Sequence, residues 1–82
     1  MNDQQLLERI ACDRKIVVGK PLIKGTRLTV EYILNLLAHG SSVADIIAEY
    51  EGIAPEDVQA CLLFASQSLS STAFMPLEAE SA

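Results

Sequence analysis

Three apolar stripes at helical spacing constrain this sequence more than any other feature, and a glycine follows each of the first two. Within a stripe, apolar residues recur at positions such as i, i+3, i+4 and i+7, which line one face of an α-helix. The stripes predict helices over about residues 30–39, 43–51 and 55–68. Their members, in chain order, are Val30, Ile33, Leu34 and Leu37; then Val43, Ile46, Ile47 and Tyr50; then Val58, Cys61, Leu62, Ala65 and Leu69.

Local signals mark the ends of these helices. Thr29 is a candidate N-cap for the first helix, and Ser42 with Asp45 has the spacing of a capping box before the second. Pro55 suits the first position of the third helix, where its missing N–H would have no partner in any case. Because the connecting loops are short, consecutive helices should be direct neighbours in space. The residues predicted to end the first two helices are His39, Gly40 and Gly52.

The segment before the helices predicts a small amount of β-structure. Two short β-branched runs, over residues 15–19 and 21–24, predict a hairpin within about residues 15–28. For the first residues two interpretations stay open, a short leading helix over 2–10 or a strand from Arg9 to Ala11.

The fold class that follows is mainly α, in a single domain over residues 1–68. It has a three-helix helix-turn-helix plan and a short N-terminal β-hairpin. Residues 69–82, rich in serine and ending acidic, are predicted to be a flexible tail. A chain of 82 residues with only 5% aromatic residues can build little core, which favours support from a second copy, so we predict a homodimer.

Charge divides the chain in two. Residues 1–27 hold all six Lys and Arg against three carboxylates, whereas residues 28–82 hold eight carboxylates and no Lys or Arg. Because phosphate attracts only the first part, any DNA contact should use it, whereas the second part suits a basic protein partner. The candidate nucleic-acid contacts are Lys15, Lys20, Lys24 and Arg27.

The third predicted helix would be the one that enters a DNA groove in a helix-turn-helix protein, yet it contains no Lys or Arg. Its carboxylates would approach phosphates, which disfavours reading of DNA by this helix. Leu63 and Phe64 lie off its main stripe, which is typical of a protein interface. Together with acidic residues and the apolar residues of the tail, they give a candidate partner interface of Glu49, Glu51, Glu56, Asp57, Leu63, Phe64, Phe74, Met75 and Leu77.

Several classes of function find no support in the residues. The single histidine, His39, has no neighbouring partner for a triad, and the sequence contains no glycine-rich phosphate loop. Cys12 and Cys61 stand far apart without metal-ligand spacing, so we expect reduced thiols, with Cys61 in the core. No membrane span or signal peptide is evident, which predicts a cytoplasmic protein. We therefore expect no catalytic activity, cofactor, metal or small-molecule ligand.

The segment from residue 19 to residue 30, GKPLIKGTRLTV, resembles the GKPvIxGTRIxV signature of the bacterial domain-of-unknown-function family 433. The resemblance extends over about residues 9–67, with Glu51 where the family usually has proline and Val18 where it has a small or polar residue. It implies a homeodomain-like helical fold without enzymatic activity, in proteins often described as antitoxin-like partners of PIN-like nuclease toxins. The residues that carry the motif are Gly19, Lys20, Pro21, Gly25, Thr26 and Arg27.

The glycines, the proline and the threonine of the motif are expected to have structural roles, whereas the role of Arg27 has two interpretations. Arg27 either pins the hairpin to an acidic helix through a carboxylate or holds a phosphate or a partner's carboxylate. Our first hypothesis is a protein-binding module that neutralises a partner nuclease. The alternatives are a DNA-binding repressor that uses the basic hairpin and a purely structural dimerisation domain.

Overall fold

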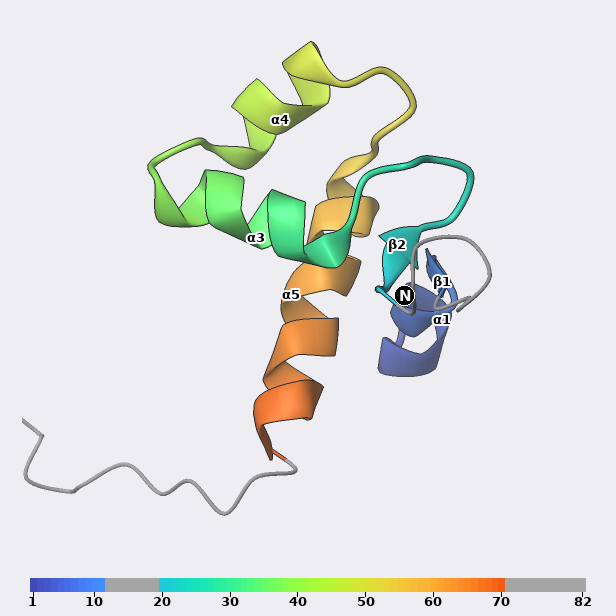
Figure 1. Cartoon of the computed structure of the whole chain (residues 1–82). Coiled ribbons are helices and arrows are strands. Elements are labelled where there is room, and N and C mark those ends of the chain that lie inside the picture. The colour runs from blue at the N-terminus through green and yellow to red at the C-terminus, as the bar shows by residue number, and fades with distance from the viewer. Residues whose placement is uncertain (12–19, 71–82) are drawn as a thin grey trace, which may run out of the picture.

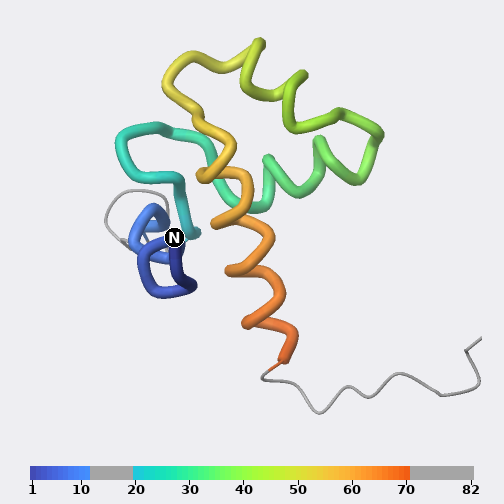
Figure 2. Tube along the Cα trace, turned by 180° about the vertical axis from the view of Figure 1, so that it is seen from behind, coloured from blue at the N-terminus to red at the C-terminus, as the bar shows by residue number. Residues whose placement is uncertain are grey.

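The computed structural model describes residues 1–11 and 20–70, and this part is mainly helical with one small antiparallel strand pair (Figure 1). The longest helix, α5, packs against each of the other labelled helices and against β1. Figure 2 shows from behind that α3 and the N-terminal segment lie on opposite sides of it. The elements are α1 (Asp3–Leu7), β1 (Ile10–Ala11), β2 (Leu22–Ile23), α3 (Val30–Ala38), α4 (Val43–Glu49) and α5 (Pro55–Ser70).

The three predicted helices are present, and the capping signals explain where they begin. The Thr29 hydroxyl accepts the Tyr32 N–H at 3.0 Å and so caps α3. At the start of α4, Ser42 and Asp45 form the predicted capping box, in which each side chain accepts the other residue's backbone N–H. Gly40 follows α3 with φ of +101°, a left-handed conformation that disfavours side chains, and it turns the chain toward α4.

The N-terminal segment contains both structures that the sequence left open. A short helix, α1, is followed by the strand β1, which pairs with β2 so that Ile10 lies opposite Ile23 and Ala11 opposite Leu22. The strand at 22–23 was predicted, and among the described residues it pairs with β1. The other predicted run, at 15–19, lies outside the described residues, so the structure confirms a small antiparallel strand pair that includes residues 22–23.

The core lies where α3, α4 and α5 meet β2. Its buried members share branched or small apolar side chains, and Ile33, Val58 and Cys61 have no exposed surface. Burial also raises the pKa of the Cys61 thiol to about 11, so Cys61 is a neutral core residue, as predicted. The core cluster consists of Ile23, Val30, Ile33, Ile46, Ile53, Val58 and Cys61.

The apolar stripe predicted for the third helix is partly wrong. Leu62 and Leu69 were assigned to the core, but they are 48% and 67% exposed. Phe64, which was assigned to an interface, instead packs against the core cluster. The buried face is turned toward Phe64 because α1 and β1 cover that side of α5. Val43, at the first position of α4, is likewise 37% exposed and not buried.

Among residues 1–11 and 20–70, no helix combines the length and the apolar character needed to cross a membrane.

Candidate partner-binding surface

An acidic hollow lies between α3 and α4. Asp45 and Glu49 are four residues apart on α4, so both carboxylates project from the same face of the helix. We call this hollow the acidic groove, and its lining residues are Leu36, Ser41, Asp45, Ile46, Glu49 and Tyr50.

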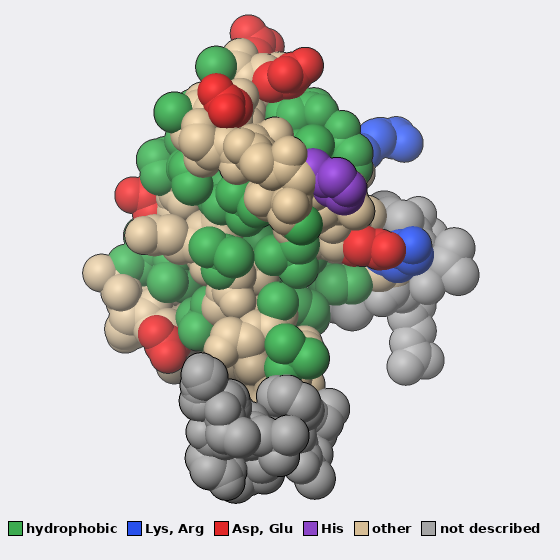
Figure 3. Space-filling view, turned by 90° about the vertical axis from the view of Figure 1, so that its left-hand side faces the viewer, with side chains coloured by type: hydrophobic (Ala, Val, Ile, Leu, Met, Phe, Trp, Pro, Cys, Tyr) green, Lys and Arg blue, Asp and Glu red, His purple; other side chains and the backbone are tan. Residues whose placement is uncertain are grey.

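No ion pair among the described residues neutralises the carboxylates of the acidic groove. The backbone N–H and hydroxyl of Ser42 lower the pKa of Asp45, so this carboxylate stays ionised. Glu49 and the nearby Glu51 are exposed, and neither forms an ion pair within the part of the chain that the structure describes. Figure 3 shows acidic side chains gathered at the α4 end of the molecule, at the top of the view.

A tyrosine pair fixes one side of the acidic groove. The hydroxyls of Tyr32 on α3 and Tyr50 after α4 are 2.6 Å apart, and their rings meet edge to face with centroids 6.0 Å apart. The hydrogen bond to Tyr32 is the main reason why the pKa of Tyr50 is raised to about 12. This contact joins the two helices, and it could not be predicted from the sequence, because nothing in the spacing of the tyrosines indicates that they meet.

Asp57 was predicted to contact a partner, and its position corrects that prediction. It is only 6% exposed, and its Oδ1 atom lies 3.0 Å from Nη1 of Arg9. Its Oδ2 atom accepts the Ala54 N–H at 2.9 Å, which compensates for the poor capping residue at the start of α5. Asp57 therefore supports the fold, and the neighbouring Glu56 is half-buried. Of the predicted acidic contacts, Glu49 and Glu51 remain exposed.

Arg9, and not Arg27, pins the strand pair to a helix. The pinning role that the sequence analysis considered for Arg27 belongs to the Arg9 guanidinium, which reaches α5 from the residue before β1. Arg27 is exposed and has no ion pair among the described residues. Lys24 is also exposed, whereas Lys20 pairs with Glu31 at 3.1 Å. Lys15 lies outside the described residues.

The described part of the family motif builds the turn between β2 and α3. Gly25 has φ of +81°, which favours glycine at this position. The Thr26 hydroxyl donates to the carbonyl of Ile23 at 2.8 Å and accepts the Leu28 N–H at 3.0 Å. The Pro21 carbonyl accepts the N–H of Val30 at the start of α3. These contacts are structural, and Gly19 lies outside the described residues.

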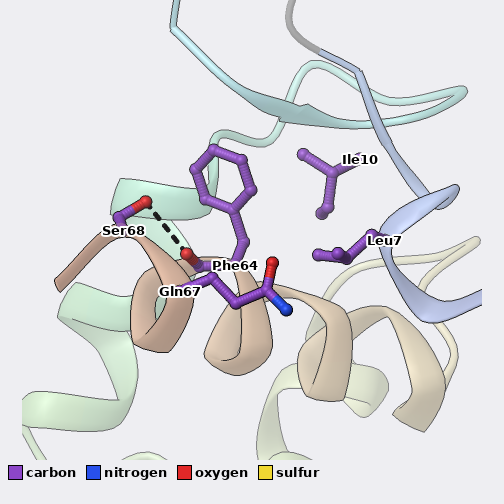
Figure 4. Close-up of a pocket in the computed structure, with 5 residues that line it drawn as sticks. All are labelled: Leu7, Ile10, Phe64, Gln67 and Ser68. Carbon is purple, nitrogen blue, oxygen red and sulfur yellow. Dashed lines mark hydrogen bonds between the residues drawn. The ribbon is translucent and has the colours of Figure 1, made fainter. Parts of the chain in front are cut away.

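The predicted apolar contacts are only partly available. Leu63 and Phe64 are both half-buried, and Phe64 forms one wall of a shallow pocket between α5 and the N-terminal segment (Figure 4). In that view Ile10 and Leu7 face α5 across the pocket. The other predicted apolar contacts, Phe74, Met75 and Leu77, lie outside the described residues.

No group of three or more histidine, cysteine, aspartate or glutamate side chains that could hold a metal ion occurs in the described ranges.

Comparison with known proteins identifies one family. Residues 10–65 match a family model described as a protein of unknown function (DUF433). No curated protein and no solved structure gives a significant match.

Proposed function

The chain belongs to the DUF433 family, and from this premise we propose that it is a non-enzymatic, antitoxin-like binding module that neutralises a PIN-like nuclease. In this proposal the acidic groove and Glu51 contact a basic surface of the nuclease. An acidic surface seated over the basic RNA channel of such an enzyme would exclude substrate by charge and by shape.

The observation that carries this proposal is the pair of carboxylates in the acidic groove, which form no ion pair in the part of the chain that the structure describes. Asp45 and Glu49 share one face of α4, and both line the hollow beside it. An arginine suits this site because its planar guanidinium can bond two carboxylate oxygens at once. Glu51 adds a third exposed charge at the end of α4, which strengthens attraction at a distance.

We further propose that α3, α4 and α5 form a homeodomain-like, helix-turn-helix arrangement used for protein contact. Three consecutive helices joined by short connections support this view. The helix that would read DNA, α5, has Glu56 and Asp57 in its first turn and no Lys or Arg along its length. Its charge therefore favours a basic protein over a phosphate backbone.

Neutralising two exposed carboxylates tests the proposal. The tagged chain is first used to recover bound proteins from a nuclease-treated lysate of its own organism, and we expect one stoichiometric small nuclease. In the variant Glu49→Gln/Glu51→Gln, we expect the affinity for that nuclease to fall by about tenfold or more, mainly through slower association at low salt. Surface-based binding kinetics at two salt concentrations measure both effects.

A matched control separates local contact from net charge. The variant Asp3→Asn/Glu8→Gln changes the net charge equally, but its sites lie on the exposed N-terminal segment. We expect it to bind the nuclease as the unaltered chain does. Equal affinities for all three proteins, or repeated recovery of the chain alone, would count against the proposal.

The second candidate function is a DNA-binding repressor, favoured by the exposed cations Lys24 and Arg27, neither of which has an ion pair within residues 1–11 and 20–70. If each protomer of a dimer contributes two phosphate contacts, affinity for duplex DNA should fall by about a hundredfold between 50 and 200 mM salt. Lys24→Gln/Arg27→Gln should abolish most of that binding and flatten its salt dependence. Absent or salt-independent binding in a titration of fluorescent duplex rejects this candidate.

A further inference from the structure

One side of α5 is apolar but is not covered by the rest of the described chain. Leu62 and Leu69 are 48% and 67% exposed, and Ala65 lies between them on the same stripe. Their spacing of three and four residues places all three on one side of the helix. We call these three residues the α5 stripe.

An apolar groove runs beside the α5 stripe, between α3 and the C-terminal half of α5. Its lining includes Val30 and Leu34 from α3 and Phe64 and Leu69 from α5. A protruding leucine next to an apolar groove is self-complementary, because the leucine of one copy can enter the groove of another. The full lining is Pro21, Val30, Glu31, Leu34, Phe64, Ala65, Ser68 and Leu69.

The distribution of charge indicates which occupant fits this surface. The segment 58–70 of α5 contains no charged residue, in a chain of which 21% of residues are charged and whose net charge is −5. Contact between the acidic parts of two copies, residues 28–57, would bring like charges together, whereas contact between the uncharged segments avoids this repulsion. A strongly charged partner protein could form no ion pair with residues 58–70.

We propose that a second copy of this chain docks on the α5 stripe. In the dimer, α5 packs against its counterpart, and Leu69 of each copy enters the groove of the other. A two-fold axis makes this contact reciprocal, so each favourable interaction occurs twice. A helix of 16 residues is about 24 Å long, which allows several turns of each α5 to pack together.

The dimer leaves the proposed nuclease-binding surface open. The lining of the acidic groove includes Asp45, Ile46 and Glu49 of α4, and Figure 1 shows α4 nearer to the N-terminal end of α5 than to its C-terminal end. Leu69 is the second-last residue of α5. The dimer therefore presents two acidic grooves. The test of dimerisation is independent of the proposed function, because the oligomeric state is measured on the isolated chain without the nuclease.

The oligomeric state of the full chain tests the proposal. In sedimentation velocity over a concentration series, we expect a species of twice the chain mass of 8.9 kDa. Leu69→Glu brings two like charges into the interface and should weaken dimerisation by at least about a hundredfold, so that the monomer predominates. Leu62→Glu should act in the same direction.

Two controls keep the result specific. Val43→Glu places the same charge at another exposed apolar residue, on α4, and should remain dimeric. Circular dichroism should show unchanged helix content in Leu69→Glu, because this side chain is 67% exposed at the end of α5.

A monomeric wild-type chain, or a dimer that survives Leu69→Glu and Leu62→Glu, would overturn the proposal. A monomer whose melting temperature falls both in Phe74→Ser/Leu77→Ser and in Leu69→Glu would assign the groove to residues 71–82 of the same chain, and would also overturn it.

Discussion

Replacing Asp57 by alanine is expected to lower the free energy of unfolding by about 3 kcal/mol. The substitution removes the ion pair with Arg9 and the acceptor for the Ala54 N–H, which both depend on this one carboxylate. The Arg9 side chain is one-third exposed, so water solvates it in part and reduces the loss. Urea unfolding followed by circular dichroism measures the change.

Two further variants divide this effect between the ion pair and the cap. Asp57→Asn keeps an oxygen that can accept the Ala54 N–H, so we expect about half of the loss. Arg9→Ala removes only the ion pair and should cost about 1 kcal/mol. The pair of Arg9→Ala and Asp57→Ala should be less than additive, because both remove the same contact. An Asp57→Ala chain as stable as the unaltered chain would show that the carboxylate has no structural role.

Replacing Ile33 by alanine is expected to cost about 3 kcal/mol of unfolding free energy. Ile33 has no exposed surface and belongs to the core cluster, so alanine leaves a cavity that the rigid neighbours fill only in part. Ile33→Val removes one methyl group and should cost about 1 kcal/mol. The urea midpoint should fall while the slope of the transition stays constant.

Val43→Ala is the matched control for the core prediction, because Val43 is 37% exposed. We expect a change of less than about 0.5 kcal/mol. If Val43→Ala and Ile33→Ala were equally destabilising, the assigned core would be wrong. Because small domains are marginally stable, a loss of 3 kcal/mol leaves a measurable unfolded fraction at moderate temperature.

The helices α3 and α4 could be predicted from the sequence because their signals are local. Thr29 and the Ser42 capping box act within one turn, and Gly40 acts at a single backbone position. The buried side of α5 could not be predicted in the same way. The apolar residues of that helix form two adjacent stripes, and either stripe could have faced the core. Contacts with α1 and β1, which come from the far end of the chain, determine which stripe is buried.

The candidate site shows the same division between local and distant causes. Glu56 and Asp57 look alike in the sequence, and only the position of Arg9, 48 residues earlier, separates the buried carboxylate from its neighbour. The acidic groove also depends on a distant contact, between Tyr32 and Tyr50. Asp45 was recognised as a capping residue, and its four-residue spacing from Glu49 was the available signal for a shared acidic face.

The central position of α5 also determines when this domain can fold during its synthesis. Translation produces α5 last among the described elements, yet α1, α3, α4 and β1 all pack against it. The ion pair between Arg9 and Asp57 can form only after Asp57 has emerged from the ribosome. The nascent chain therefore exposes the apolar residues of the earlier elements until α5 has emerged from the ribosome.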